Sequence, residues 1–134
     1  MDKSIALNVK CPNCGTSLMD PYRTIHDKPT VKLIVQHGEE RGQINICSFY
    51  GCMDHYSAIP LKKGDHIRLF CPHCEKELTS DIRCRECQST MIPFAMDHGG
   101  RLYLCSRWAC NKHYLDFDNV SDALRKLYNE YGYF

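Results

Sequence analysis

The chain has 134 residues, enough for one ordinary domain or two very small ones. It carries ten cysteines but a net charge of only +1, and nucleic-acid binders are usually far more basic. The start, MDKSIALNVK, does not read as a signal peptide, and no run of 18 apolar residues occurs. We therefore expect a cytoplasmic protein without membrane contact, whose cysteines bind metal rather than form disulfides.

The first predicted unit spans residues 1–62. Its first cysteine pair follows IALNVK (5–10), and two alternating segments, TVKLIVQ (30–36) and QINIC (43–47), predict strands. GEERG (38–42) lies between them and predicts a hairpin turn.

The second predicted unit spans residues 63–118 and begins at a polar join, LKKGD (61–65). HIRLF (66–70) and RLYLC (101–105) predict strands, and HGG (98–100) predicts a turn before the latter.

The last segment, 119–134, predicts a short α-helix with an aromatic tail. Its apolar residues follow helical spacing from Ser121, at Leu124, Leu127, Tyr128 and Tyr131. Ser121 or Asn119 can cap the start of the helix, and Gly132 can end it.

The two units share motifs, which predicts an internal repeat. Residues 47–56 and 105–114 both follow the pattern Cys-Ser-x-x-x-Cys-x-x-His-Tyr. The pair in CPNC (11–14) corresponds to the pair in CPHC (71–74), and His37-Gly38 corresponds to His98-Gly99. The offsets are 60, 61 and 58 residues, so only small insertions separate the copies.

The Cys-x-x-Cys turns have the features of metal-binding knuckles. Proline after the first cysteine pre-sets the turn, and glycine after the second allows a positive φ. Residues 11–15 have both, whereas residues 71–75 end in glutamate. Both turns resemble the knuckles of the zinc-ribbon and rubredoxin-like group, and the resemblance covers the knuckles alone. It implies structural zinc. Together with the predicted strands, the repeat and the terminal helix, it leads us to expect a small, mostly β fold of two repeated zinc-ribbon-like units of antiparallel hairpins plus a short C-terminal α-helix.

We expect ten cysteines and one histidine to bind metal: Cys11, Cys14, Cys47, Cys52, Cys71, Cys74, Cys84, Cys87, Cys105, Cys110 and His113. In the first unit the expected set is a four-cysteine site in which the pair in 11–14 combines with Cys47 and Cys52. His55 is then a spare ligand.

The second unit has more ligands than one zinc ion uses. Repeat symmetry combines the pair in 71–74 with Cys105 and Cys110. The spacing Cys-x2-Cys-x9-Cys-x2-Cys instead combines it with the pair in 84–87, and Cys105, Cys110 and His113 then need a further ligand.

His98 or His55 could supply that ligand, and the sequence leaves both schemes open. Two or three zinc ions are expected per chain, with three favoured. Iron in a rubredoxin-like frame is the alternative metal.

We predict no catalytic residues and no small-molecule substrate. His37 and Glu39 form the His-x-Glu pattern of zinc deaminases, but the Pro-Cys-x-x-Cys of that signature is missing. Every expected site can be closed by protein ligands, which is the condition for structural zinc.

The function predicted from these features is a protein-interaction module, such as a small accessory subunit of a larger assembly. The aromatic tail YNEYGYF (128–134), Trp108 and Phe49 are candidate anchors for a protein partner. Nucleic-acid binding is the alternative, through a face that combines Trp108 and Tyr103 with Arg83, Arg85, Arg101, Arg107 and Lys112. A rubredoxin-like iron electron carrier is the third.

Overall fold

The computed structural model describes residues 6–49, 52, 54–96, 99–108 and 113–116, and of 113–116 it describes the backbone alone. This part of the chain forms nine strands, and every strand pair in it is antiparallel. The prediction of a mostly β fold is therefore confirmed. Within the same residues, no helix has the length and apolarity to cross a membrane. The helix predicted over 119–134 lies outside the described residues.

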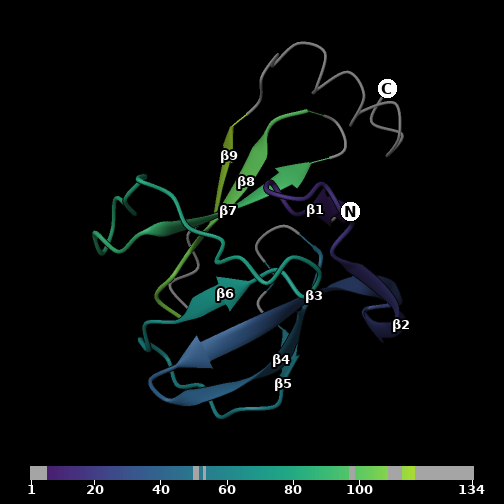
Figure 1. Cartoon of the computed structure of the whole chain (residues 1–134), viewed down its shortest axis with the longest axis horizontal. Helices are drawn as coiled ribbons and strands as arrows, with labels where there is room; N and C mark the ends of the chain where they lie inside the picture. The colour runs from purple at the N-terminus through teal and green to yellow at the C-terminus, as the bar shows by residue number, and fades with distance from the viewer. Residues whose placement is uncertain (1–5, 50–51, 53, 97–98, 109–112, 117–134) are drawn as a thin grey trace, which may run out of the picture.

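The first sheet is drawn in blue and teal in Figure 1. Its strands follow the chain in the order β2 (Met19–Ile25), β3 (Lys28–His37), β4 (Glu40–Ile46) and β5 (His55–Ser57). The short strand β6 (Arg68–Phe70) pairs with the second half of β3, beyond the part that β2 covers. The predicted strands 30–36, 43–47 and 66–70 overlap β3, β4 and β6.

The second sheet has the order β1 (Val9–Lys10), β7 (Met91–Met96), β8 (Arg101–Cys105) and β9 (His113–Asp116). It lies on the other side of the molecule from β4 and β5 (Figure 1). The sequence predicted β8 but not β7, because MIPFAM is apolar throughout and contains a proline. Among the described residues β1 pairs only with Ala95 and Met96, and no other strand pairs with β7 on that side, so the missing N–H of Pro93 is tolerated.

Two short strands are exchanged between the predicted units. β1 belongs to the first unit but pairs with β7, and β6 belongs to the second unit but pairs with β3. The two exchanged strands also pair at equivalent positions. Val9 pairs with Met96, and Leu69 pairs with Val35. Leu69 lies 60 positions after Val9, and Met96 lies 61 positions after Val35. The boundary near residue 62 stays a prediction, since strand pairing crosses it in both directions.

The larger of two hydrophobic clusters among the described residues lies between the sheets, because each sheet presents alternate side chains to the other. Its members include Leu33, Val35, Ile44 and Leu69 from the first sheet, and Ile92, Phe94, Met96, Leu102 and Leu104 from the second. Burying one such side chain stabilises a fold by about 1.5–3 kcal/mol. The two halves therefore stabilise each other, and the cysteine-bearing turns project from this shared core.

Candidate metal centres

Three Cys-x-x-Cys turns share one backbone geometry. In the first, the Cys11 N–H donates to the Thr16 carbonyl at 2.9 Å, and the Gly15 N–H donates back to the Cys11 carbonyl at 2.9 Å. The same two bonds, at the same spacing, close the turns that begin at Cys71 and Cys84. Each turn also needs a positive φ at its fifth residue, which is 75° at Gly15, 62° at Glu75 and 65° at Gln88.

Backbone N–H groups in these turns point at the sulfur atoms. Cys11 Sγ accepts from the N–H of Asn13 at 3.3 Å and of Cys14 at 3.4 Å. Cys71 Sγ accepts from the N–H of His73 at 3.3 Å and of Cys74 at 3.5 Å. Such bonds stabilise a thiolate, which is the form that binds metal.

Four sulfur atoms from the first and second turns form one cluster: Cys11, Cys14, Cys71 and Cys74. Cys11 Sγ lies 3.8 Å from Cys74 Sγ, and Cys14 Sγ lies 3.8 Å from Cys71 Sγ. A zinc–sulfur bond of about 2.3 Å gives a tetrahedron with sulfur–sulfur edges of about 3.8 Å. The four side chains therefore fit a tetrahedral zinc ion.

This cluster corrects the expected ligand pairing in both units. The pair in 11–14 does not combine with Cys47 and Cys52, and the pair in 71–74 combines neither with Cys105 nor with the pair in 84–87. The physical reason is the strand exchange. β1 and β6 each pair with the sheet of the other unit, so the knuckles that follow them meet between the sheets.

Hydrogen bonding lowers the pKa of one thiol in the four-cysteine cluster, and burial raises the pKa of another. Hydrogen bonds from Thr16, its hydroxyl first, lower the pKa of Cys14 to about 6. Burial raises the pKa of Cys71 to about 12. Without a cation, the cluster thus combines a thiolate with a buried thiol. A bound divalent cation would stabilise four thiolates together.

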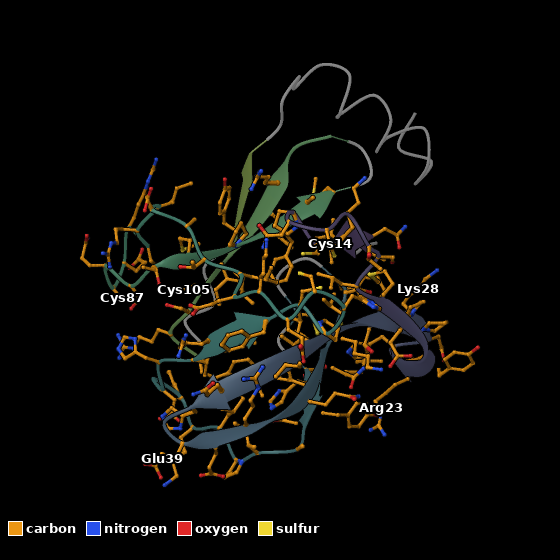
Figure 2. The ribbon with its side chains drawn as sticks, viewed as in Figure 1. Cys14, Arg23, Lys28, Glu39, Cys87 and Cys105 are labelled. Atoms are coloured by element: carbon orange, nitrogen blue, oxygen red, sulfur yellow. The ribbon has the colours of Figure 1, made fainter. Side chains whose placement is uncertain are left out.

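A second cluster contains Cys84, Cys87 and Cys105, far from Cys14 in the molecule (Figure 2). Cys87 Sγ lies 3.4 Å from Cys105 Sγ. A hydrogen bond from the Ser89 side chain is the main reason why the pKa of Cys87 is lowered to about 6. Cys110 lies outside the described residues, as does the His113 side chain, so their predicted roles as ligands here stay predictions.

A third cluster joins Cys47 and Cys52 to His26, a residue to which sequence analysis gave no role. His26 lies at the tip of the β2–β3 hairpin, and the two cysteines lie in the loop after β4. The predicted repeat contains a signal for this site. His26 and Cys87 are 61 positions apart, the offset that relates His37 to His98. His26 thus occupies the position of the second cysteine in the 84–87 turn.

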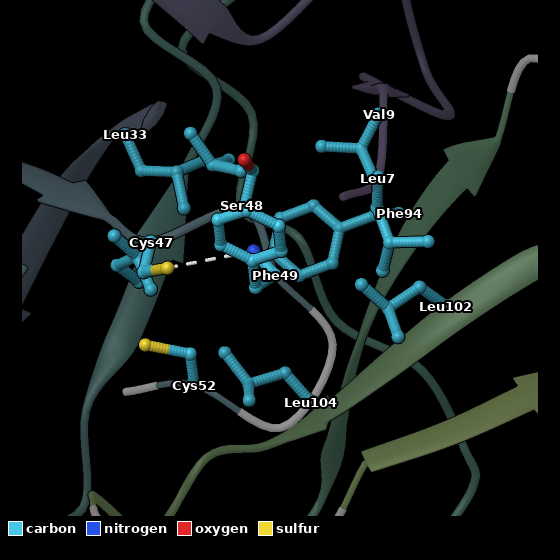
Figure 3. A pocket seen from close by; sticks show the side chains of 12 residues that line it. Leu7, Val9, Leu33, Cys47, Ser48, Phe49, Cys52, Phe94, Leu102 and Leu104 are labelled. Carbon is cyan, nitrogen blue, oxygen red and sulfur yellow. Dashed lines mark hydrogen bonds between the residues drawn. The ribbon is translucent and has the colours of Figure 1, made fainter. Parts of the chain in front are cut away.

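An apolar cavity adjoins Cys47 and Cys52 (Figure 3). It has a volume of about 30 Å³, roughly the share of one water molecule. Its other lining side chains come mainly from the core, among them Leu7, Leu33, Phe94 and Leu104. The cavity is therefore too small for an organic substrate, and it makes one side of the third cluster apolar.

Other predicted ligands and anchors lie elsewhere. His55 packs edge-on against Trp108, with ring centroids 4.6 Å apart, and His55 is not part of any of the three clusters.

Trp108 and Tyr103 are buried, so neither can stack on a nucleic-acid base or anchor a partner. Phe49 is half-buried and lines the cavity. The aromatic part of the predicted nucleic-acid face is therefore wrong, whereas its described arginines, Arg83, Arg85, Arg101 and Arg107, are exposed.

The three clusters fit metal ions by their chemistry, since cysteine sulfur and histidine nitrogen are the usual ligands of zinc. The nine described cysteines form no disulfide with one another. Comparison of the chain with protein-family models, with curated proteins and with solved structures found no match.

Proposed function

We propose that this chain is a structural-zinc protein of two repeated zinc-ribbon-like units, and that it acts as a protein-interaction module within a larger assembly. The observation that carries the proposal is the four-cysteine cluster of Cys11, Cys14, Cys71 and Cys74. Four protein thiols complete a tetrahedron and leave no position for a substrate or a reacting water. Such a closed site stabilises a fold and does not catalyse a reaction.

The repeat is supported by the registers of the two sheets. Val31 pairs with Ile46 in the first sheet, and the positions 61 and 58 residues later, Ile92 and Leu104, pair in the second. The isolated bridge between Ala6 and Phe49 likewise matches that between His66 and Arg107. Two copies of one unit, joined by exchanged strands and a shared metal site, account for these correspondences.

A protein partner is supported by two exposed tyrosines on the first sheet. Tyr22 is 98% exposed at a bulge in β2, where its N–H donates to Asp20 Oδ1. Tyr56 is exposed on β5, and the Arg23 guanidinium lies 5.0 Å from its ring centroid. Tyrosine and arginine are enriched at interface hot spots. Tyr22, Arg23 and Tyr56 are therefore our candidate anchor residues.

The structural role of zinc is tested by chelation of the purified protein. Removing the metal should abolish cooperative thermal unfolding, because ligands from both halves would lose their common ion. Restoring zinc should restore the transition. An unchanged melting curve in metal-free protein would contradict a structural role.

The interaction role is tested on tagged protein expressed in its source cells. We expect it to elute from a size-exclusion column well above its 15.5 kDa mass, with a partner in fixed ratio. A Tyr22→Ser/Tyr56→Ser variant should lose the partner while its melting temperature and metal content stay unchanged. Ile82→Ser is the matched control, since Ile82 is also an exposed apolar residue. Elution as a free monomer would contradict the proposal.

The aromatic tail needs a separate truncation of residues 129–134. Loss of the partner with unchanged melting would assign the tail to the interface, as the sequence predicted. Retention of the partner would leave the tyrosines of the first sheet as the anchors.

A further inference from the structure

The His26 cluster has one ligand fewer than a zinc ion requires among the residues that the structure describes. Ligand atoms of His26, Cys47 and Cys52 lie within 4.8 Å of one another. In the corresponding cluster of the second unit, Cys84 and Cys87 both contribute. The position 61 residues before Cys84 is Arg23, which cannot bind a cation. A fourth donor must therefore come from elsewhere.

We propose that Asp54 supplies this donor, so that His26, Cys47, Cys52 and Asp54 form a mixed-ligand zinc site. Asp54 Oδ2 lies 2.7 Å from His26 Nε2, and the same carboxylate is hydrogen-bonded to the Cys52 side chain. The carboxylate thus contacts two of the three other ligands, but it lies outside the group whose ligand atoms are all within 4.8 Å of one another, so it would move inward when zinc binds. A zinc ion would replace the protons that these groups share. The inference rests on the proposed structural-zinc function and adds a site of different chemistry.

Backbone hydrogen bonds position three of the four side chains, those of Cys47, Cys52 and Asp54. Cys47 N–H donates to the Asp54 carbonyl at 2.8 Å, and Cys52 N–H donates to the Phe49 carbonyl at 3.0 Å. The first of these bonds brings Asp54 next to Cys47, and the second holds Cys52 beside Phe49. Phe49 N–H donates to Cys47 Sγ at 3.5 Å, as the knuckle amides do in the four-cysteine cluster. The loop therefore presents two sulfurs and a carboxylate on the side that faces His26.

His26 is held over this loop by an unusual turn. His26 and Asp27 connect β2 and β3, and both have positive φ, at 54° and 63°. Asn-Gly is the common sequence for such two-residue turns, and positive φ is uncommon for histidine. Backbone strain of this kind is often retained where a side chain has a function. The His26 ring also packs against Phe49, with ring centroids 6.1 Å apart.

The mixed-ligand site differs from the four-cysteine site in its access to solvent. The His26 and Asp54 side chains are 55% and 64% exposed. Asp54 also lines an open surface hollow with Ile25, His55 and Tyr56. Two thiolates bind zinc less tightly than four, and chelators can reach an exposed carboxylate. We therefore expect this zinc to exchange faster than the ion in the four-cysteine site.

The test uses the purified zinc-loaded chain, with zinc alone as the ligand. Native mass spectrometry should find three zinc ions in the wild type and two in His26→Ala. Asp54→Ala should bind its third zinc more than about 100-fold more weakly, because loss of a carboxylate that only supports a ligand already costs about 10–100-fold. Asp27→Asn is the matched control, because it changes a neighbouring carboxylate and should leave three ions bound.

Replacement of zinc by cobalt gives a second signature. Nitrogen and oxygen donors should give the third cobalt ion visible bands at shorter wavelength than a four-thiolate ion, and His26→Ala should remove those bands alone. An equal zinc count in wild type and His26→Ala would overturn the inference while leaving the proposed function intact. Loss of the ion in His26→Ala but normal affinity in Asp54→Ala would overturn the role of Asp54. A chain without any zinc would overturn the proposed function itself.

Discussion

The sulfur atoms of Cys11 and Cys74 lie 3.8 Å apart, although the two residues are separated by 63 positions in the chain. This contact joins the knuckle after β1 to the knuckle after β6. Because β1 pairs with the second sheet and β6 with the first, a metal ion held there would connect both halves of the core. The metal would then act on global rather than local stability.

The first prediction concerns this connection. Cys74→Ser should lower the free energy of unfolding by several kcal/mol, since binding of a structural zinc ion contributes on the order of 10 kcal/mol to folding. Hydrogen exchange should show faster opening of β3 and β7 alike. Cys87→Ser is the control, because Cys87 belongs to the second cluster. It should speed exchange in β7 and β8 only, and equal patterns in the two variants would refute the connection.

Most of what the sequence predicted correctly comes from local signals. Alternation found β3, β4 and β8, and the Cys-Pro-x-Cys motifs located two of the three knuckles. The predicted ligand pairing is wrong because it keeps each metal site within one unit, whereas the four-cysteine cluster combines ligands from both. Exchange of β1 and β6 is a long-range property, and no local pattern encodes it.

His26 shows a different reason why a metal ligand could not be predicted from the sequence. A histidine in a polar segment has no motif around it, and the sequence analysis assigns no counterpart of Cys84 and Cys87 to the first unit. Only the offset of 61 residues, applied to Cys87, identifies His26 as that counterpart. The matching positive φ of Asp27 and Gln88, also 61 positions apart, supports the alignment.

The second prediction concerns backbone strain in the knuckles. Glu75 has a φ of 62°, where side chains other than glycine cost about 1 kcal/mol. Glu75→Gly should therefore stabilise the protein by about 0.5–1 kcal/mol. Gly15→Ala should destabilise it by about 1 kcal/mol through φ alone, since a Cβ there meets no atom within 4 Å. Chemical denaturation measures both, and effects of the same sign would contradict the strain argument.

The third prediction concerns a buried polar network that positions β2. Asn45 is 2% exposed, and its Nδ2 donates to Thr30 Oγ1 and to Asp20 Oδ2, both at 3.0 Å. Asn45→Leu leaves the buried Thr30 hydroxyl without this donor and should cost about 1–3 kcal/mol.

Because β2 leads to His26, the variant should also weaken zinc binding at the mixed-ligand site. Gln43→Ala is the control, since Gln43 is exposed and its side-chain amide donates to Asn45 Oδ1. Urea denaturation and zinc titration of the two variants separate these effects. A melting curve of Asn45→Leu equal to that of the wild type would show that the network is dispensable.

The fourth prediction concerns the release of zinc at low pH. As the pH falls, protons compete with metal for its ligands. The His26 site should release zinc first, because it holds the ion with two thiolates rather than four and burial raises the pKa of Cys47 to about 12. The four-cysteine site shares one such thiol, Cys71, but the lowered pKa of Cys14, about 6, keeps that ligand ionised to lower pH.

A colorimetric zinc indicator should therefore record release in separate steps as the pH is lowered. The first step should be missing from His26→Ala and present in the Asp27→Asn control. A first step that persists in His26→Ala would place the labile ion elsewhere.

The central claim is that metal at the four-cysteine cluster organises the fold, and metal analysis of wild type and one variant tests it most directly. Inductively coupled plasma mass spectrometry on protein purified without added metal should give about three zinc ions per chain, one for each cluster, and negligible iron. A Cys11→Ser/Cys14→Ser variant should lose one ion together with cooperative unfolding. Substantial iron would make the chain a rubredoxin-like electron carrier, and a metal-free wild type that still melts cooperatively would contradict the account.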